Sequence, residues 1–183
     1  MSEEIIVRNC SPTLAGMKTG SMFSCTHNSV SELRREIREL NRRLAVKGLR
    51  IIPLRITETN ALIYVYRPNR LKNDLRSTEV ASILEEHGYS CDGPEKCIAD
   101  LVRRVRNNEE FPHEIGLFLG YPPEDVRGFI ENNAKCSKCV GKWKVYGDEK
   151  KAKELFERYN RCTSFYVKQH INGCPLDRLA LSV

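Results

Sequence analysis

Cys10, His113 and Glu114 are the residues whose types could together carry out thiol chemistry. Cys10 follows the apolar run "IIV" and directly precedes a Ser-Pro step that is typical of a helix start. His113 and Glu114 stand side by side in "FPHEIGLFLGYPPEDV". A thiol becomes nucleophilic when it ionises, and both a helix N-terminus and a nearby imidazole favour the thiolate. The sequence therefore predicts Cys10 as a nucleophile, His113 as its base and Glu114 as a nearby acid/base or polarising group.

Lys18 and Tyr121 are the candidate substrate-binding residues of this arrangement. Lys18 lies one to two turns beyond Cys10, where its ammonium group could hold an anionic substrate or lower the pKa of the thiol. A structural interpretation stays open beside the functional one. In it, Cys10 is a small core residue at a strand end, His113 is a helix cap and Tyr121 packs in the "GYPP" turn.

The "CSKC" stretch suggests a second kind of site. Cys136 and Cys139 are separated by two residues, which is the spacing of half a tetrahedral metal site or of a redox disulfide. Cys162 could add a third ligand, and His170 or Cys174 a fourth, for zinc, iron or an iron–sulfur cluster. A loop with two incidental thiols is the third interpretation. The pair follows a predicted helix and precedes a predicted strand, which is the reverse of the thioredoxin arrangement.

The cysteines and the N-terminus point to a reducing compartment. The eight cysteines stand at positions 10, 25, 91, 97, 136, 139, 162 and 174. The N-terminal "MSEEIIVRNC" is acidic and lacks the basic and apolar regions of a signal peptide. No apolar run approaches the ~18 residues of a membrane span. The sequence thus predicts a cytoplasmic protein that has no membrane partner and whose thiols are free or bind metal.

Composition narrows the class of partner. The chain has 183 residues and a net charge of +6, with 40% apolar and 30% charged residues. Its basic residues interleave with acids, as in "SELRREIRELNRRL", a pattern typical of a solvated helix face. Nucleic-acid binding is therefore not expected as the main role, because the basic excess is small against a large background of both signs.

Hydrophobic periodicity predicts the elements that must position these residues. A short strand is expected over 4–9, followed by a short helix from Ser11. The apolar face of 29–47 repeats at spacings of three and four residues, which predicts an amphipathic helix capped by Ser29 or Ser31. Two strands joined by a short turn follow, and Pro53 predicts that the first is an edge strand or carries a bulge. The predicted strands are 49–56, 61–67 and 141–148, and the later helices are 77–87, 94–107, 113–120, 122–133 and 149–168.

This order of elements predicts an α/β or α+β protein with a single domain over residues 1–183. We expect a small mixed sheet of about four strands with a helical layer. No repeat or linker divides the chain. The sequence leaves open whether residues 1–8 and 175–183 are flexible tails, although the apolar C-terminal residues favour docking on the body.

Five segments of the chain are distinctive when taken together: "NCSPTLAGMKTGSMF", "ALIYVYRP", "FPHEIGLFLGYPPEDVRGFI", "CVGKWKVYGD" and "RCTSFY". Together they resemble the domain-of-unknown-function family numbered 3793, which is found mostly in anaerobic bacteria. The resemblance runs from about residue 6 to residue 175. The family's motif positions correspond to Cys10, Pro12, Thr13, Gly16, Lys18, His113, Glu114, Gly120, Tyr121, Pro122, Cys139, Trp143, Tyr146, Gly147 and Cys162. In the family a His often precedes the first Cys, where this chain has Asn9, which argues against a metal site at the N-terminal motif.

The resemblance implies a link to iron or redox status, because genes of the family often lie near flavodoxin and ferrous-iron transport genes. Three hypotheses result. The chain is a thiol-centred protein or enzyme, a metal or iron–sulfur module for sensing or delivery, or a non-enzymatic partner of a small acidic electron-transfer protein such as a flavodoxin. In the third case the basic helix within 32–47 would assist the encounter through its charge.

Overall fold

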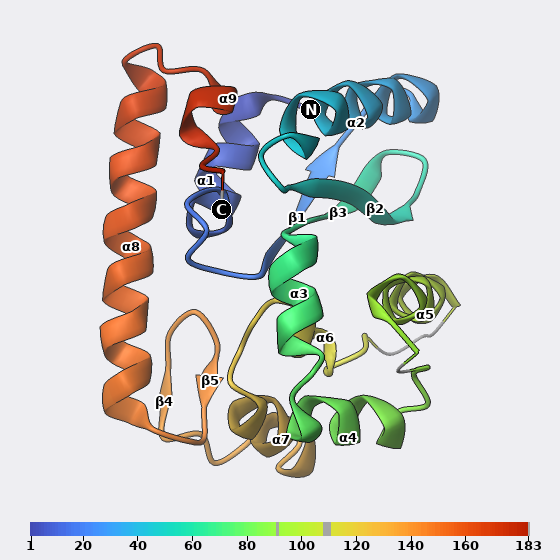
Figure 1. Ribbon diagram of the computed structural model, residues 1–183, viewed down its shortest axis with the longest axis vertical. Coiled ribbons are helices and arrows are strands. Elements are labelled where there is room, and N and C mark those ends of the chain that lie inside the picture. Colours follow the sequence, from blue (N-terminus) through green and yellow to red (C-terminus); the bar gives the residue numbers. More distant parts are fainter. Residues whose placement is uncertain (91, 108–110, 183) are drawn as a thin grey trace. The chain divides into compact units, whose positions relative to one another are not determined.

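A computed structural model describes residues 1–90, 92–107 and 111–182 of the chain (Figure 1). The chain forms two compact units, and we describe each by itself. The first unit comprises Met1–Asn69 and Arg161–Val183, and the second comprises Arg70–Asn160. The predicted fold class is confirmed, since a small sheet is combined with many helices. The single domain expected from the sequence stays a prediction.

The first unit contains a three-stranded antiparallel sheet. Its strands are β1 (Gly20–Thr26), β2 (Arg50–Ile56) and β3 (Asn60–Tyr66), in the order β1-β3-β2. The hairpin of β2 and β3 was predicted, and so was the role of Pro53. The register of β2 shifts between Pro53 and Arg55, and β2 lies at a sheet edge, where a residue without a backbone N–H is tolerated.

Helices α1 (Glu3–Leu14) and α2 (Val30–Ala45) build the core on this sheet, α1 against β1 and α2 against β2 (Figure 1). Ser29 caps α2, as one of the two predicted caps, by accepting a hydrogen bond from the Glu32 backbone N–H. The end of α8 (Glu149–Ile171) and the short α9 (Leu176–Leu179) complete the unit. The hydrophobic core residues of α1 and α2 are Ile6, Val7, Cys10, Leu14, Leu33, Ile37, Leu40 and Leu44.

The strand predicted over residues 4–9 is wrong, because these residues form the first half of α1. The Ser2 hydroxyl caps the helix by accepting from the Ile5 backbone N–H, and two acidic residues lie in the first turn. The helix turns Ile6 and Val7 into the core together with Cys10, one turn later. Burial of this face therefore overrides the strand propensity of the β-branched run.

The short helix expected from Ser11 is present as the last turn of α1, which ends at Leu14, and β1 follows from Gly20. Along this strand Ser21, Phe23 and Cys25 are buried while Ser24 and Thr26 are exposed, which is the alternation of a half-buried strand. The signal is weak in the sequence, because serine and threonine supply several of the strand's residues.

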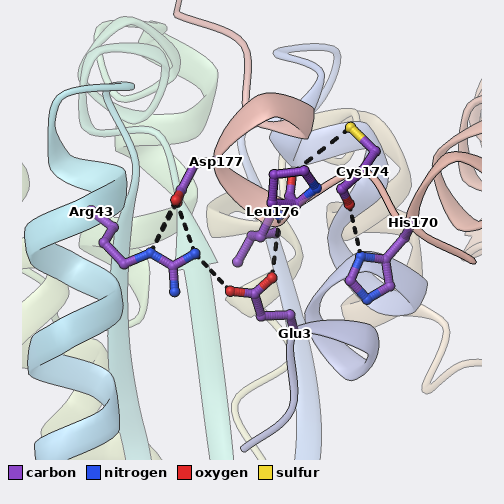
Figure 2. Close-up of polar contacts among 7 residues, drawn as sticks. Glu3, Arg43, His170, Cys174, Leu176 and Asp177 are labelled. Atoms are coloured by element: carbon purple, nitrogen blue, oxygen red, sulfur yellow. Dashed lines mark hydrogen bonds and ion pairs between the residues drawn. The ribbon is translucent and has the colours of Figure 1, made fainter. Parts of the chain in front are cut away.

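Residues near both chain ends pack in the first unit. Arg43 of α2 donates to the Asp177 carboxylate through Nε and Nη2 and to Glu3 through Nη2, which joins α2 to α9 and to the start of α1 (Figure 2). Leu176 and Leu179 are buried in the core of the first unit.

Arg67 is the largest fully buried side chain of the first unit. Its guanidinium donates to the carbonyl oxygens of Thr13 and Leu14, both at 2.7 Å, at the C-terminal end of α1. It also donates to the carbonyls of Lys47 and Leu181. A buried charge is tolerated when its donors are satisfied, and the negative end of the α1 dipole favours a cation here.

The second unit is mostly helical. α4, α5, α6 and α7 confirm the predicted helices, whereas α3 was not predicted. Of the strand predicted over 141–148 only β5 forms, paired with β4, which precedes the predicted range, so the described residues form five strands rather than about four. No helix in the described ranges is long and apolar enough to cross a membrane. The bounds are α3 (Pro68–Asp74), α4 (Thr78–Glu86), α5 (Pro94–Asn107), α6 (Ile115–Phe118), α7 (Pro123–Glu131), β4 (Cys139–Val140) and β5 (Lys144–Val145).

Candidate functional site

Cys10 lies in the middle of α1, so the expected position just before a helix N-terminus is wrong. Its side chain is fully buried in the core of the first unit. Burial raises the pKa of the thiol to about 12, although the charge of Lys18 and a hydrogen bond with Ser21 act in the opposite direction. At neutral pH the residue is therefore a protonated thiol, which favours the structural interpretation of Cys10.

His113 and Glu114 lie in the second unit, where their environments differ. His113 is exposed, and its ring meets the edge of the Phe129 ring at a centroid distance of 4.9 Å. Glu114 is buried and accepts a hydrogen bond of 2.9 Å from the Tyr89 hydroxyl. Since Cys10 belongs to the first unit, its pairing with His113 stays a prediction.

The predicted metal ligands are divided between the units. Cys136 and Cys139 belong to the second unit and Cys162 to the first, where burial raises the pKa of the Cys162 thiol to about 11. Among the described residues, no group of three or more His, Cys, Asp or Glu side chains could hold a metal ion. The three-cysteine metal site stays a prediction, and Cys91 lies outside the described residues.

His170 and Cys174, the alternative fourth ligands, lie close together around the end of α8 (Figure 2). The Nδ1 atom of His170 is 3.1 Å from the carbonyl oxygen of Cys174. The Cys174 sulfur points to the carbonyl of Pro175 rather than to the imidazole. This contact closes the turn between α8 and α9 and is structural.

Cys136 and Cys139 stand in a sharply turned loop between α7 and the β4–β5 hairpin. Asn133, Ala134 and Cys136 all have φ between 48° and 61°, the left-handed region that non-glycine residues seldom adopt. Cys136 is exposed, and Cys139, which starts β4 opposite Val145, is half-buried. Both thiols are free.

Two lysines hold this loop in its conformation. The Lys144 ammonium donates to the Ala134 carbonyl, and the Lys138 ammonium to the Gly147 carbonyl, each at 2.6 Å. The Lys138 backbone N–H also donates to the Val145 carbonyl at 2.8 Å. These bonds offset the cost of the left-handed residues, which is of the order of 1–2 kcal/mol each.

Asp125 of α7 anchors the hairpin. Its buried carboxylate accepts three hydrogen bonds of 2.7 Å, from the Trp143 indole N–H and from the backbone N–H groups of Tyr146 and Gly147. A buried carboxylate with three donors is well satisfied and fixes the geometry of its neighbours. The loop of the two cysteines is thus attached to a rigid element.

An aromatic cluster covers the hairpin around Trp143. The Trp143 ring stacks on Tyr121 at 4.6 Å and meets the Phe156 ring edge-on at 4.5 Å. Burial raises the pKa of the Tyr121 hydroxyl. Tyr121 therefore packs against the hairpin, and its predicted role in binding substrate stays a prediction.

The electrostatic surroundings of the two thiols come from residues that sequence reasoning did not single out for this role. The Tyr146 hydroxyl oxygen is buried and has no hydrogen-bond partner among the described residues. Burial and the neighbouring Cys136 raise the pKa of this hydroxyl, so it stays a donor. The ion pair with Glu149 and, to a smaller extent, the neighbouring Cys139 raise the pKa of Lys153.

An open hollow of about 710 Å³ adjoins the loop in the second unit. Lys138, which stands between the two cysteines in sequence, lines it together with Lys150 and Lys153. Acidic residues of α8 line much of the rest, so the hollow suits a polar group of mixed charge. The lining residues are Lys138, Gly147, Asp148, Glu149, Lys150, Lys153, Glu154 and Glu157.

Comparison with known proteins gives a family and no closer relative. The family model described as "Protein of unknown function (DUF3793)" matches residues 6–180. No curated protein and no solved structure matches the chain.

Proposed function

The chain belongs to the DUF3793 family, and we propose that it is a redox-active dithiol protein that works by thiol–disulfide exchange at Cys136 and Cys139. This function keeps the thiol-centred hypothesis and moves its site from the N-terminal motif to the "CSKC" loop. The observation that carries it is the position of two accessible free thiols, three residues apart, in one anchored loop.

The choice between metal binding and redox chemistry rests on the number of ligands. Zinc and iron–sulfur sites take four ligands, and the described residues provide no third ligand for this pair. Two thiols separated by two residues are by themselves sufficient for a reversible disulfide. The dithiol function therefore needs nothing beyond the loop itself.

The proposed reaction transfers two electrons from the chain to a disulfide substrate. The Cys136 thiol first loses its proton to water. The resulting thiolate attacks one sulfur of the substrate, and the substrate S–S bond breaks. A mixed disulfide forms, and the first substrate thiolate leaves and takes up a proton. The Cys139 thiol then loses its own proton to water, and the resulting thiolate attacks the Cys136 sulfur. This step closes the intramolecular disulfide and releases the second substrate thiolate, which is protonated in turn.

The surroundings support this division of roles. Cys136 is the more exposed thiol and meets the substrate first, whereas Cys139 is half-buried in β4 and acts as the resolving thiol. The Tyr146 hydroxyl, which has no partner in the described part of the chain, provides a hydrogen-bond donor for the Cys136 thiolate. Lys153 provides a positive charge for Cys139.

Oxidation by a low-molecular-weight disulfide tests the proposal. We expect oxidised glutathione to convert the native protein to a form that lacks two hydrogens. Trypsin cleaves after Lys135, Lys138 and Lys142, so the two cysteines fall in separate peptides. Mass spectrometry of the unreduced digest should then show Cys136-Ser137-Lys138 linked to the peptide Cys139–Lys142.

Single variants assign the order of attack. Cys139→Ser should accumulate the glutathione adduct of Cys136, whereas Cys136→Ser should react more slowly at Cys139. Cys174→Ser is the matched control, because it removes a half-buried thiol of the other unit and should leave the linked peptides unchanged. Oxidised protein that yields no linked peptides would refute the dithiol function. So would oxidation that is slowed equally by all three substitutions.

A further inference from the structure

The outward face of α2 carries a row of arginines. Arg34, Arg38 and Arg42 are exposed and follow one another at intervals of four residues. Four residues correspond to a rotation of about 40° beyond a full turn and a rise of about 6 Å, so the three guanidinium groups share one face. The opposite face of α2 is the apolar one that packs on the sheet.

The acidic residues of α2 do not neutralise this row. Glu36 pairs with the N-terminal amino group and Glu32 with Arg35. Glu39 is exposed beside the row and forms no ion pair with it, so the three arginines have no hydrogen bond or ion pair to any described side chain. Arg43, on the flank towards α9, is by contrast held by Glu3 and Asp177 (Figure 2). The row is thus a concentrated positive surface rather than part of an internal network.

An apolar residue lies next to the row. Val46, directly after the last turn of α2, is 79% exposed, although it belongs to a residue type that is usually buried. It follows Arg42 by four residues, which places it at the end of the same face. Arginines around an exposed aliphatic side chain are typical of protein-binding surfaces, where arginine is enriched.

We infer that the face formed by Arg34, Arg38, Arg42 and Val46 binds an acidic segment of a partner protein. Charge complementarity selects carboxylates as the counterpart of the arginine row. A nucleic acid fits less well, because the row has an apolar end and α2 has no exposed aromatic residue to stack on bases. The partner is therefore a protein segment with carboxylates spaced as on a helix and an apolar side chain at one end.

The backbone of the first unit makes this face rigid. The Asn41 side-chain amide accepts from the Ile51 backbone N–H at 2.8 Å and donates to the Ile51 carbonyl at 2.7 Å. Asn41 thereby fixes α2 to the outer edge of β2 and satisfies backbone groups that would otherwise offer a pairing edge. A partner meets a helix whose backbone is already fixed, so no backbone entropy of α2 is lost on binding.

Binding to synthetic peptides tests this inference. The probe is a fluorescent peptide of about 20 residues that is helical and carries glutamates every four residues and one terminal leucine. The controls are a peptide of the same composition in scrambled order and an oligothymidine of similar charge. We expect the full-length chain to bind the ordered peptide at least ~10-fold more tightly than either control, with an affinity that falls as salt rises.

Charge reversal locates the surface. Arg34→Glu, Arg38→Glu and Arg42→Glu together should abolish binding. Lys151→Glu, Arg158→Glu and Lys168→Glu, an equal change of charge on exposed positions of α8, should leave most of it. Val46→Ala should weaken binding several-fold without unfolding, as checked by circular dichroism. No binding by the wild-type chain, equal loss in both triple variants, or preference for the oligothymidine would overturn the inference.

Discussion

Burial separates the described cysteines into groups with different chemistry. Cys10, Cys25 and Cys97 are buried, and burial raises the pKa of the Cys10 and Cys25 thiols, so they behave as small apolar residues. Cys136 is exposed and Cys139 is half-buried in the same loop. Residue type alone does not distinguish these groups, because the thiol's reactivity depends on what surrounds it.

The high pKa of Cys10 predicts that stability falls in alkaline solution. The pKa is about 12 in the folded state against 9.0 for an unperturbed thiol, so above pH 9 the unfolded state loses this proton first. Stability due to this thiol is intact below pH 9 and falls by up to about 1.4 kcal/mol per pH unit between pH 9 and pH 12. Urea unfolding of the wild type and of Cys10→Ala between pH 8 and pH 11 measures the difference.

The difference between the two curves isolates Cys10, because every other titrating group is common to both proteins. The gap should narrow above pH 9, as the wild type loses the advantage that the filled core gives it below that pH. Two parallel curves across the whole range would contradict the placement of an ionisable thiol in this core.

At the scale of elements, the β4–β5 hairpin determines where Cys139 lies. Gly141 joins the two strands and sits against the Phe156 ring, where an added Cβ atom would overlap ring carbons. Asp125 and the aromatic cluster hold the same hairpin from α7 and α8. A glycine at this position is therefore required by packing and not by a positive φ.

We predict that Gly141→Ala destabilises the protein by about 1–3 kcal/mol, since the ring of Phe156 must move to accept the methyl group. Phe156→Leu should lower the cost of Gly141→Ala, and a double-mutant cycle by urea denaturation measures this coupling. Gly173→Ala is the matched control, because open space surrounds Gly173. Its φ of 88° makes the substitution costly, but this cost should not depend on Phe156. Strictly additive costs of the two substitutions would disprove the predicted overlap.

The elements that the sequence predicts correctly are those with a strong local signal. α2 follows from the four-three-four spacing of its leucines and isoleucine, and the β2–β3 hairpin follows from two β-rich runs around a short turn. The strand predicted over 4–9, the first half of α1, is wrong because "IIV" has strand propensity, while the buried face of the helix depends on contacts with β1. Such contacts are absent from any local window.

At the scale of the whole molecule, α8 belongs to both units, because the boundary between them falls at residue 160, within the helix. Both units contain buried hydrophobic residues, and α8 runs from Glu149 to Ile171 through the boundary. α8 is therefore the continuous element through which unfolding of one unit can affect the other.

Asn160→Pro tests this coupling. Asn160 is exposed, and proline removes one helical hydrogen bond and clashes with the preceding turn, at a cost of about 3 kcal/mol. Trp143, the single tryptophan, reports on the second unit, whereas circular dichroism reports on both. The two unfolding curves should coincide in the wild type and in Asn160→Ala, and separate in Asn160→Pro. Separate curves already in the wild type would contradict the coupling.

Part of the candidate site could be predicted from the sequence, and part of it could not. The spacing of Cys136 and Cys139 is enough to mark a dithiol or half a metal site. The roles of Tyr146 and Asp125 could not be predicted, since each depends on an interaction with a residue at least ten positions away. The only sequence signals were the strand-like pattern of "WKVY" and the acids of "PPEDV".

The sequence by itself determined the helix periods, the β2–β3 hairpin and the two-thiol motif, because these depend on the order of neighbouring residues. Only the tertiary structure decided that Cys10 is a core residue with a raised pKa, that Cys136 is exposed, and that one face of α2 carries arginines unpaired within the described chain. The physical reason is that burial and ion pairing depend on which distant segments meet, and a thiol or a guanidinium changes its behaviour with the surroundings that those segments create.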